Sequence, residues 1–124
     1  MKLEELYPNL DDLEKYLWEM ANLAPDTTGI DSVMVWASQA QDGALRHGPR
    51  VKVSAHKTNR MIPTDVFVLT IQNDPQIVAG ECYLGADALE DVKDWVSKNK
   101  DLLLKYWKGE ISTKQFVNEL EPLK

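Results

Sequence analysis

Hydrophobic residues near the start of the chain recur at the spacing of one helical face, and the positions between them are mostly acidic or polar. This spacing predicts a helix from about Leu10 to Ala24, because Asn9 can cap its first turn and Pro25 cannot continue it. Residues 26–29 then form a predicted loop. The apolar face of the predicted helix consists of Leu10, Leu13, Leu17, Met20 and Ala24.

Four segments in the middle of the chain have the composition and spacing of β-strands. One of them, Arg50–His56, alternates polar and apolar residues, as a strand with one buried face does. The others are short runs rich in β-branched or aromatic residues. Because short turns such as Asn73–Pro75 favour hairpins, the pattern predicts an antiparallel sheet of about four strands in meander order. The predicted strands are residues 33–36, 50–56, 66–71 and 76–83, with a loop over residues 38–49.

The last third of the chain begins with a long helical pattern. Apolar residues from Leu89 to Tyr106 form a stripe at helical spacing, which predicts a helix that lies across one face of the sheet. Asp87, followed three residues later by Glu90, is a variant of the capping box at the start of this helix. Gly109 is suited to its C-terminal cap.

A second capping box, Ser112–Gln115, predicts a short terminal helix that ends near Pro122. Ile111 and Phe116 have the spacing of a hydrophobic staple at its start. The whole pattern predicts a single α+β domain over residues 1–124. Its expected elements are an N-terminal helix, an antiparallel sheet of about four strands, a long C-terminal helix and a short terminal helix packed on one face.

The composition is that of an ordinary globular protein, with 44% hydrophobic and 27% charged residues among 124. No apolar run approaches the roughly 20 residues that span a bilayer. The N-terminus carries acids where a signal peptide carries bases. The single cysteine, Cys82, has no partner for an internal disulfide, and we expect it to be a small buried hydrophobe on a strand. These features predict a cytoplasmic protein that does not engage a membrane.

The net charge of −6 conceals a segregation of charge along the chain. Residues 1–31 carry eight acids and two bases, residues 32–64 carry one acid and five bases, and residues 65–124 carry eleven acids and seven bases. The central segment is therefore cationic, whereas both flanking segments are acidic. This distribution argues against a general nucleic-acid binder, because the whole domain of such a protein is usually basic.

The basic residues of the central segment form the strongest chemical signal in the sequence. A period of two places Arg50, Lys52 and His56 on one face of the predicted strand, with no acid between them. Such a face would attract an anion: a phosphate, a nucleic-acid backbone or the acidic surface of a partner. A solvent-facing sheet or a protected edge strand produces the same pattern without binding anything. The candidate anion- or partner-binding residues are Arg46, His47, Arg50, Lys52, His56 and Arg60.

Catalytic and metal chemistry has less support. Two histidines and one distant cysteine do not supply the three or four convergent ligands of a zinc site, so we expect no metal. The chain has no nucleotide-binding, hydrolase or redox motif, and we therefore assign no cofactor and no catalytic residue. A metal-independent nuclease is an alternative, in which His47 acts as general base while Arg46 and Arg50 stabilise the charged transition state.

The chain has four tryptophans, of which Trp95 lies on the predicted helical stripe and is expected in the core. Trp107 directly follows Tyr106 at the end of the same helix. We expect one of these two aromatic side chains to face inward and the other to be partly exposed. Trp107 is therefore a candidate anchor for a protein partner.

Several stretches of the chain carry a family likeness. They are RVKVS, DVFVLTI, a turn with NDP, and above all the pattern N-x2-LLL-x-YW-x-GEIST-x2-F from Asn99 to Phe116. On these residues the chain from Arg50 onward resembles small bacterial and prophage-carried proteins of unknown function. The resemblance implies a bacterial or phage origin and brings no activity with it.

The absence of a catalytic constellation and the segregation of charge favour a non-catalytic binding or regulatory protein that acts through protein–protein contact. One alternative is a nucleic-acid-binding protein or nuclease that uses the basic segment from Arg46 to Arg60. Another is an acidic inhibitor whose predicted N-terminal helix imitates nucleic-acid phosphates through Asp11, Asp12 and Glu14.

Overall fold

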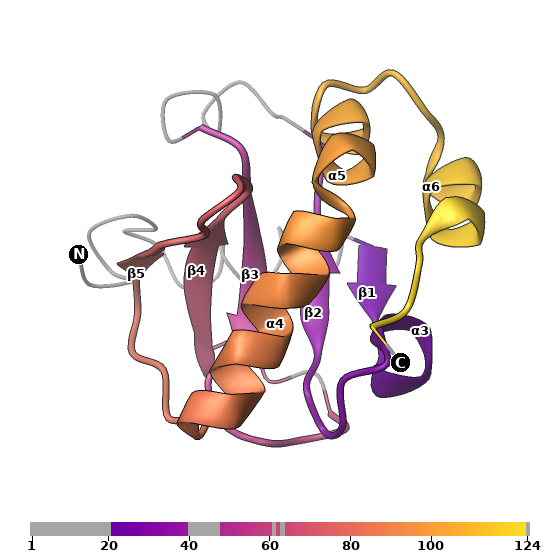
Figure 1. The fold of residues 1–124 in the computed structure, drawn as a ribbon. Coiled ribbons are helices and arrows are strands. Elements are labelled where there is room, and N and C mark those ends of the chain that lie inside the picture. The colour runs from indigo at the N-terminus through magenta and orange to yellow at the C-terminus, as the bar shows by residue number, and fades with distance from the viewer. Residues whose placement is uncertain (1–20, 40–47, 61, 63, 124) are drawn as a thin grey trace.

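The computed structural model describes residues 21–39, 48–60, 62 and 64–123. These residues form an α+β structure around a five-stranded antiparallel sheet in the order β1-β2-β3-β4-β5 (Figure 1). The strands are β1 (Ala21–Leu23), β2 (Val35–Ala37), β3 (Arg50–Ser54), β4 (Val66–Thr70) and β5 (Ile77–Ala79). The helices are α3 (Pro25–Thr28), α4 (Ala86–Lys98), α5 (Lys100–Trp107) and α6 (Thr113–Glu119).

The predicted α+β class and the antiparallel meander are confirmed, but the sheet has a strand that the sequence pattern assigned to a helix. Residues 21–23 form β1, because Ala21 and Leu23 alternate inward and pair with β2 while Asn22 is exposed. Pro25 is the first residue of α3 and begins a helical turn, a position where its missing N–H costs nothing. The predicted end of the N-terminal helix at Ala24 is therefore wrong, and its remainder lies outside the described residues.

The core lies between one face of the sheet and the C-terminal helices. Strand residues at alternate positions, such as Val53 and Phe67, pack in one cluster with Val92, Trp95 and Val96 of α4. Figure 1 shows α4 running across this face of the sheet, as its apolar stripe predicts. Leu103 and Tyr106 of α5 and Phe116 of α6 extend the same cluster, and the Tyr106 and Phe116 rings stack with centroids 4.2 Å apart.

The long C-terminal helix of the prediction consists of two helices that meet at Asn99. The side-chain amide of Asn99 donates to the carbonyl of Trp95 at 3.1 Å, so this residue closes α4 instead of continuing it. The residue that precedes α4 is Gly85, which has no side chain and therefore accepts no capping hydrogen bond from the first turn. Asp87 lies within the first turn, and the predicted capping box there is wrong.

The predicted C-terminal cap at Gly109 is confirmed. Its φ of 75° is in the left-handed region, which glycine adopts without strain. Its N–H donates to the carbonyl of Tyr106 at 3.0 Å, and the N–H of Glu110 donates to that of Lys105 at 2.9 Å. This pair of bonds satisfies carbonyls at the end of α5 and turns the chain towards α6.

The cap of α6 is also confirmed, and it permits a stability prediction. The hydroxyl of Ser112 accepts a hydrogen bond from the N–H of Gln115 at 3.1 Å. Replacing Ser112 with alanine should lower the free energy of unfolding by about 1 kcal/mol, because that N–H loses its partner. Ser112→Gly is the control. In urea unfolding it should lower the free energy of unfolding by only roughly a few tenths of a kcal/mol. Equal losses in both variants would contradict the assignment of the cap.

Candidate functional site

The predicted basic face of residues 50–56 exists in part, but it does not face solvent. Arg50, Lys52 and Ser54 share one face of β3, as the period of two predicts. β3 lies between β2 and β4, and the side chains of Arg50 and Lys52 are only 2% and 1% exposed. The prediction of an exposed cationic face is therefore wrong, and so is the alternative of a protected edge strand. The sequence pattern could not reveal this, because it does not specify whether the second face of a sheet is covered.

Arg50 lies at the beginning of β3 and contacts the end of α5. Its guanidinium donates to the carbonyl of Gly48 at 3.1 Å and lies over the ring of Trp107, 5.3 Å from its centroid. Trp107 is only 4% exposed. The expectation that this tryptophan is partly exposed is therefore wrong, since both it and Tyr106 are buried.

Lys52 lies in the middle of the sheet, where it pairs with Trp36 on β2 and Val68 on β4. Its ammonium group is removed from water, and this burial lowers the pKa of Lys52 well below its ordinary value, with a smaller contribution from the charge of Arg50. Arg50 and Lys52 both have interaction partners within the molecule. Both side chains therefore belong to the interior of the protein and not to its surface.

His56 lies beyond the other end of β3, and it is exposed. Its Nδ1 lies 2.9 Å from both carboxylate oxygens of Asp65. A carboxylate only accepts hydrogen bonds, so Nδ1 carries the proton and Nε2 is directed away from this pair. The imidazole stacks on the ring of Tyr83, with centroids 4.5 Å apart and an interplanar angle of 15°. The hydroxyl of Tyr83 donates in turn to the carboxylate of Glu81.

The backbone brings these four residues together from three separate segments. Ala55, next to His56, donates its N–H to the carbonyl of Asp65 at 2.9 Å and accepts the N–H of Tyr83 at 2.8 Å. Tyr83 reaches this place because the chain turns away from β5 at Gly80, where φ is 78°. A Cβ at Gly80 would lie 2.6 Å from the carbonyl oxygen of Val66, so only glycine allows the chain to pass this close to β4.

The negative charges in this group act on the tyrosine. The hydrogen bond to Glu81 and the charge of that carboxylate raise the pKa of Tyr83 above its ordinary value, and Asp65 adds a smaller effect. Tyr83 therefore stays neutral and acts as a hydrogen-bond donor across the physiological range. We call the four residues His56, Asp65, Glu81 and Tyr83 the His56–Tyr83 surface.

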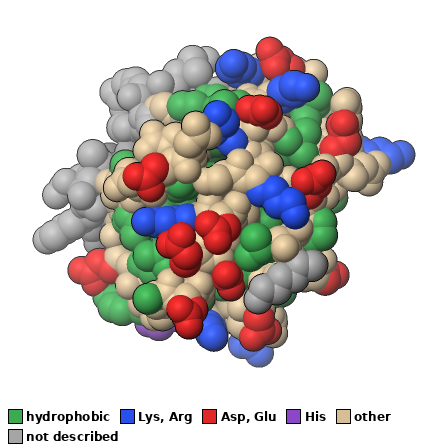
Figure 2. All heavy atoms as spheres, in the orientation of Figure 1, with side chains coloured by type: hydrophobic (Ala, Val, Ile, Leu, Met, Phe, Trp, Pro, Cys, Tyr) green, Lys and Arg blue, Asp and Glu red, His purple; other side chains and the backbone are tan. Residues whose placement is uncertain are grey.

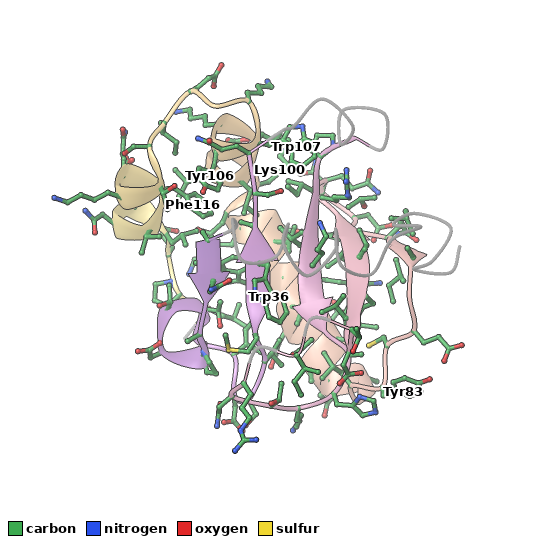
Figure 3. The ribbon with its side chains drawn as sticks, turned by 180° about the vertical axis from the view of Figure 1, so that it is seen from behind. Trp36, Tyr83, Lys100, Tyr106, Trp107 and Phe116 are labelled. Atoms are coloured by element: carbon green, nitrogen blue, oxygen red, sulfur yellow. The ribbon has the colours of Figure 1, made fainter. Side chains whose placement is uncertain are left out.

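The structure does not bring the predicted site residues together. Arg50 is the first residue of β3 and His56 lies two residues beyond its last, so the two are at most about 20 Å apart along the strand direction. Figure 3 shows the same division, with Trp107 near one end of the molecule and Tyr83 near the other. Lys57 and Arg60 are exposed in the loop that follows His56. Arg46 and His47 lie outside the described residues.

Sequence reasoning missed three members of the His56–Tyr83 surface. Asp65, Glu81 and Tyr83 lie far from His56 along the chain, and local spacing contains no sign of their contact. The predicted strand over residues 76–83 also concealed the tyrosine, because β5 ends at Ala79. Cys82, expected on that strand, lies beyond it and packs partly buried against the core. The single glycine within that predicted strand was the available signal for a turn.

Within the described residues, no group of three or more His, Cys, Asp or Glu side chains is placed to hold a metal ion. No helix in the same part of the chain is long and apolar enough to cross a membrane. A scan against models of protein families found no match for this chain, and searches of curated proteins and of solved structures found none either.

Proposed function

We propose that the protein is a non-catalytic binding or regulatory protein that acts through protein–protein contact, with the His56–Tyr83 surface at the centre of its contact area. The observation that supports this proposal is the exposure of an ordered aromatic side chain. Tyr83 is 58% exposed, more than any other large hydrophobic side chain among the described residues. Its ring is nevertheless held in place by His56 and Glu81.

Such an arrangement is well suited to binding. Tyrosine is among the residues that most often dominate the binding energy of protein interfaces. A side chain that is already held in one position loses little conformational entropy when a partner covers it. Ile62, whose carbonyl accepts the N–H of Asp65 at 3.0 Å, adds an exposed apolar side chain to this region. The carboxylates of Asp65 and Glu81 and the exposed Lys57 supply the polar rim that interfaces of this kind have.

The nucleic-acid alternative has less support than the sequence suggested. Arg50 and Lys52, two of its central residues, are buried, and only exposed groups can neutralise phosphates. On the face covered by α4, acidic and basic side chains lie beside one another and form no broad basic area (Figure 2). The acids of the inhibitor alternative, Asp11, Asp12 and Glu14, lie outside the described residues. We further propose a cytoplasmic location, on the single cysteine, and a bacterial or phage origin, on the resemblance.

Replacing Tyr83 with alanine should weaken binding of the partner about 10- to 100-fold, the loss typical of a dominant interface aromatic. The partner is first captured in the source cells by a photo-crosslinking amino acid placed at position 57, beside the surface. Affinity is then measured by calorimetry with the purified pair. Val117→Ala is the matched control, because Val117 is also an exposed apolar side chain, 39% exposed, but lies on α6.

Two results would reject the proposal. One is an unchanged affinity of the captured partner for the Tyr83→Ala variant, which would place the contact elsewhere. The other is the absence of any crosslinked macromolecule together with turnover of a substrate in a broad activity screen, which would make the protein an enzyme.

A further inference from the structure

The last described residues of the chain lie as an extended segment along the junction of α4 and α5. Asn99 holds this segment at its centre through the backbone of Glu121. The amide nitrogen of Asn99 donates to the carbonyl of Glu121 at 2.9 Å, and the N–H of Glu121 donates to the amide oxygen at 2.9 Å. The side chain thus binds one residue of the segment as a neighbouring β-strand would.

Contacts on either side complete the attachment. The ammonium group of Lys98 donates to the carbonyl of Pro122 at 3.0 Å, and the N–H of Leu123 donates to the carbonyl of Thr28 at 2.8 Å. Leu120 is buried and Leu123 is half-buried against the core, whereas Glu121 and Pro122 are exposed. All four hydrogen bonds therefore go to backbone atoms, and the segment uses two leucines three residues apart as its apolar anchors.

Asn99 is oriented by its own helix as well as by the segment that it binds. Its side chain is buried and its amide nitrogen also donates to the carbonyl of Trp95 at 3.1 Å, which sets the direction of the amide. If the segment left, the amide oxygen would exchange the N–H of Glu121 for water, and an occupant with a free N–H and C=O would restore both bonds. The junction consequently favours an occupant that presents a free N–H and C=O on an extended backbone.

We propose that this junction is a binding site for an extended peptide of a partner protein, with leucine-like side chains three residues apart, and that residues 120–123 occupy it as an intramolecular ligand. The bound segment itself shows which chemistry fits. Backbone recognition does not depend on the identity of the two middle residues, so a segment of another protein with the same anchors meets the same contacts. Release of residues 121–123 breaks no hydrogen bond within a helix or strand, whereas release of Leu120 also breaks the bond from its N–H to the carbonyl of Phe116, 3.2 Å long, at the end of α6. This site is separate from the His56–Tyr83 surface and goes beyond the function proposed for it.

The intramolecular segment competes strongly, because attachment to the same chain keeps it at an effective concentration of about millimolar. Weakening the segment should therefore open the site to a peptide added in solution. The probe is a fluorescent peptide with the sequence of residues 118–123, Asn-Glu-Leu-Glu-Pro-Leu, and the readout is fluorescence anisotropy. The full chain carrying Leu123→Ala should bind this peptide about tenfold more tightly than the unaltered chain does. Leu123 is only half-buried, so this substitution leaves most of the core intact.

Two controls make the test specific for the site. A peptide in which both leucines are alanine should not bind, and adding Asn99→Leu to the Leu123→Ala chain should abolish binding of the original peptide. Circular dichroism establishes that each variant is folded, and the milder Leu123→Val replaces Leu123→Ala if the latter fails this check. If the folded variant binds the peptide no better than the unaltered chain, or if Asn99→Leu has no effect, residues 120–123 are only a structural strap and the proposal is wrong. Neither result depends on Tyr83, so this test and that of the proposed function fail independently.

Discussion

Replacing Gly80 with alanine should lower the free energy of unfolding by about 3 kcal/mol or more, the combined effect of backbone strain and overpacking. Gly80 has a φ of 78°, which an alanine adopts only with strain. The added Cβ would also lie 2.6 Å from the carbonyl oxygen of Val66 and 2.9 Å from the Cα of Phe67. Both are backbone atoms of β4, which is held between β3 and β5, and cannot move aside as a flexible side chain would.

Two other glycines separate strain from crowding in this experiment. Gly109 has a similar φ of 75° but open space around its Cβ position, so Gly109→Ala should cost only about 1 kcal/mol. Gly85 has a negative φ and open space, so Gly85→Ala adds neither strain nor crowding and should cost only about 0.5–1 kcal/mol, the preference of an N-cap for glycine over alanine. Urea unfolding of the three variants gives the comparison. A loss for Gly80→Ala no larger than that for Gly109→Ala would show that β4 and the following turn adjust easily.

The same substitution should also disturb the His56–Tyr83 surface. The turn at Gly80 places Tyr83 where its N–H reaches the carbonyl of Ala55. Amide hydrogen exchange at Tyr83 should therefore be faster in the folded Gly80→Ala variant, while exchange within α4 stays slow. Unchanged protection at Tyr83 would mean that the contact with Ala55 forms independently of the turn.

The buried Lys52 should make the protein more stable as the pH rises in the alkaline range. Burial lowers the pKa of Lys52 in the folded protein, while the unfolded chain keeps the ordinary value of 10.5. Between these two values the unfolded state binds more protons than the folded state. The free energy of unfolding therefore increases with pH in this window, by up to about 1.4 kcal/mol per pH unit, and the increase ends above 10.5.

A difference measurement isolates this effect from other titrating groups. The free energy of unfolding is measured from pH 8 upward for the unaltered chain and for Lys52→Met, and one curve is subtracted from the other. Carboxylates stay ionised throughout this range, so they do not contribute to the slope. Lys105→Met is the control, because Lys105 is exposed on α5 and its removal should leave the slope unchanged. A difference that does not vary with pH for Lys52→Met would show that Lys52 titrates normally.

Much of the architecture could be predicted, because its determinants are local. The alternation of Val51 and Val53, the helical stripe that contains Trp95, and the caps at Gly109 and Ser112 all depend on residues within a few positions of one another. The errors occurred where a distant partner decided the outcome. β1 is a strand because β2 lies beside Ala21 and Leu23, and α4 ends where Asn99 also binds the backbone of Glu121.

The candidate site shows the same difference between local determinants and distant partners, and shows it more strongly. By itself the sequence determined the fold class, the face of β3 on which Arg50 and Lys52 lie, the end of α5 and the start of α6, since periodicity and capping are properties of short segments. Only the tertiary structure decided that these two cations are interior, because burial depends on what covers a sheet and not on the pattern within one strand. It likewise decided that His56 meets Tyr83, through a close approach that Gly80 alone permits.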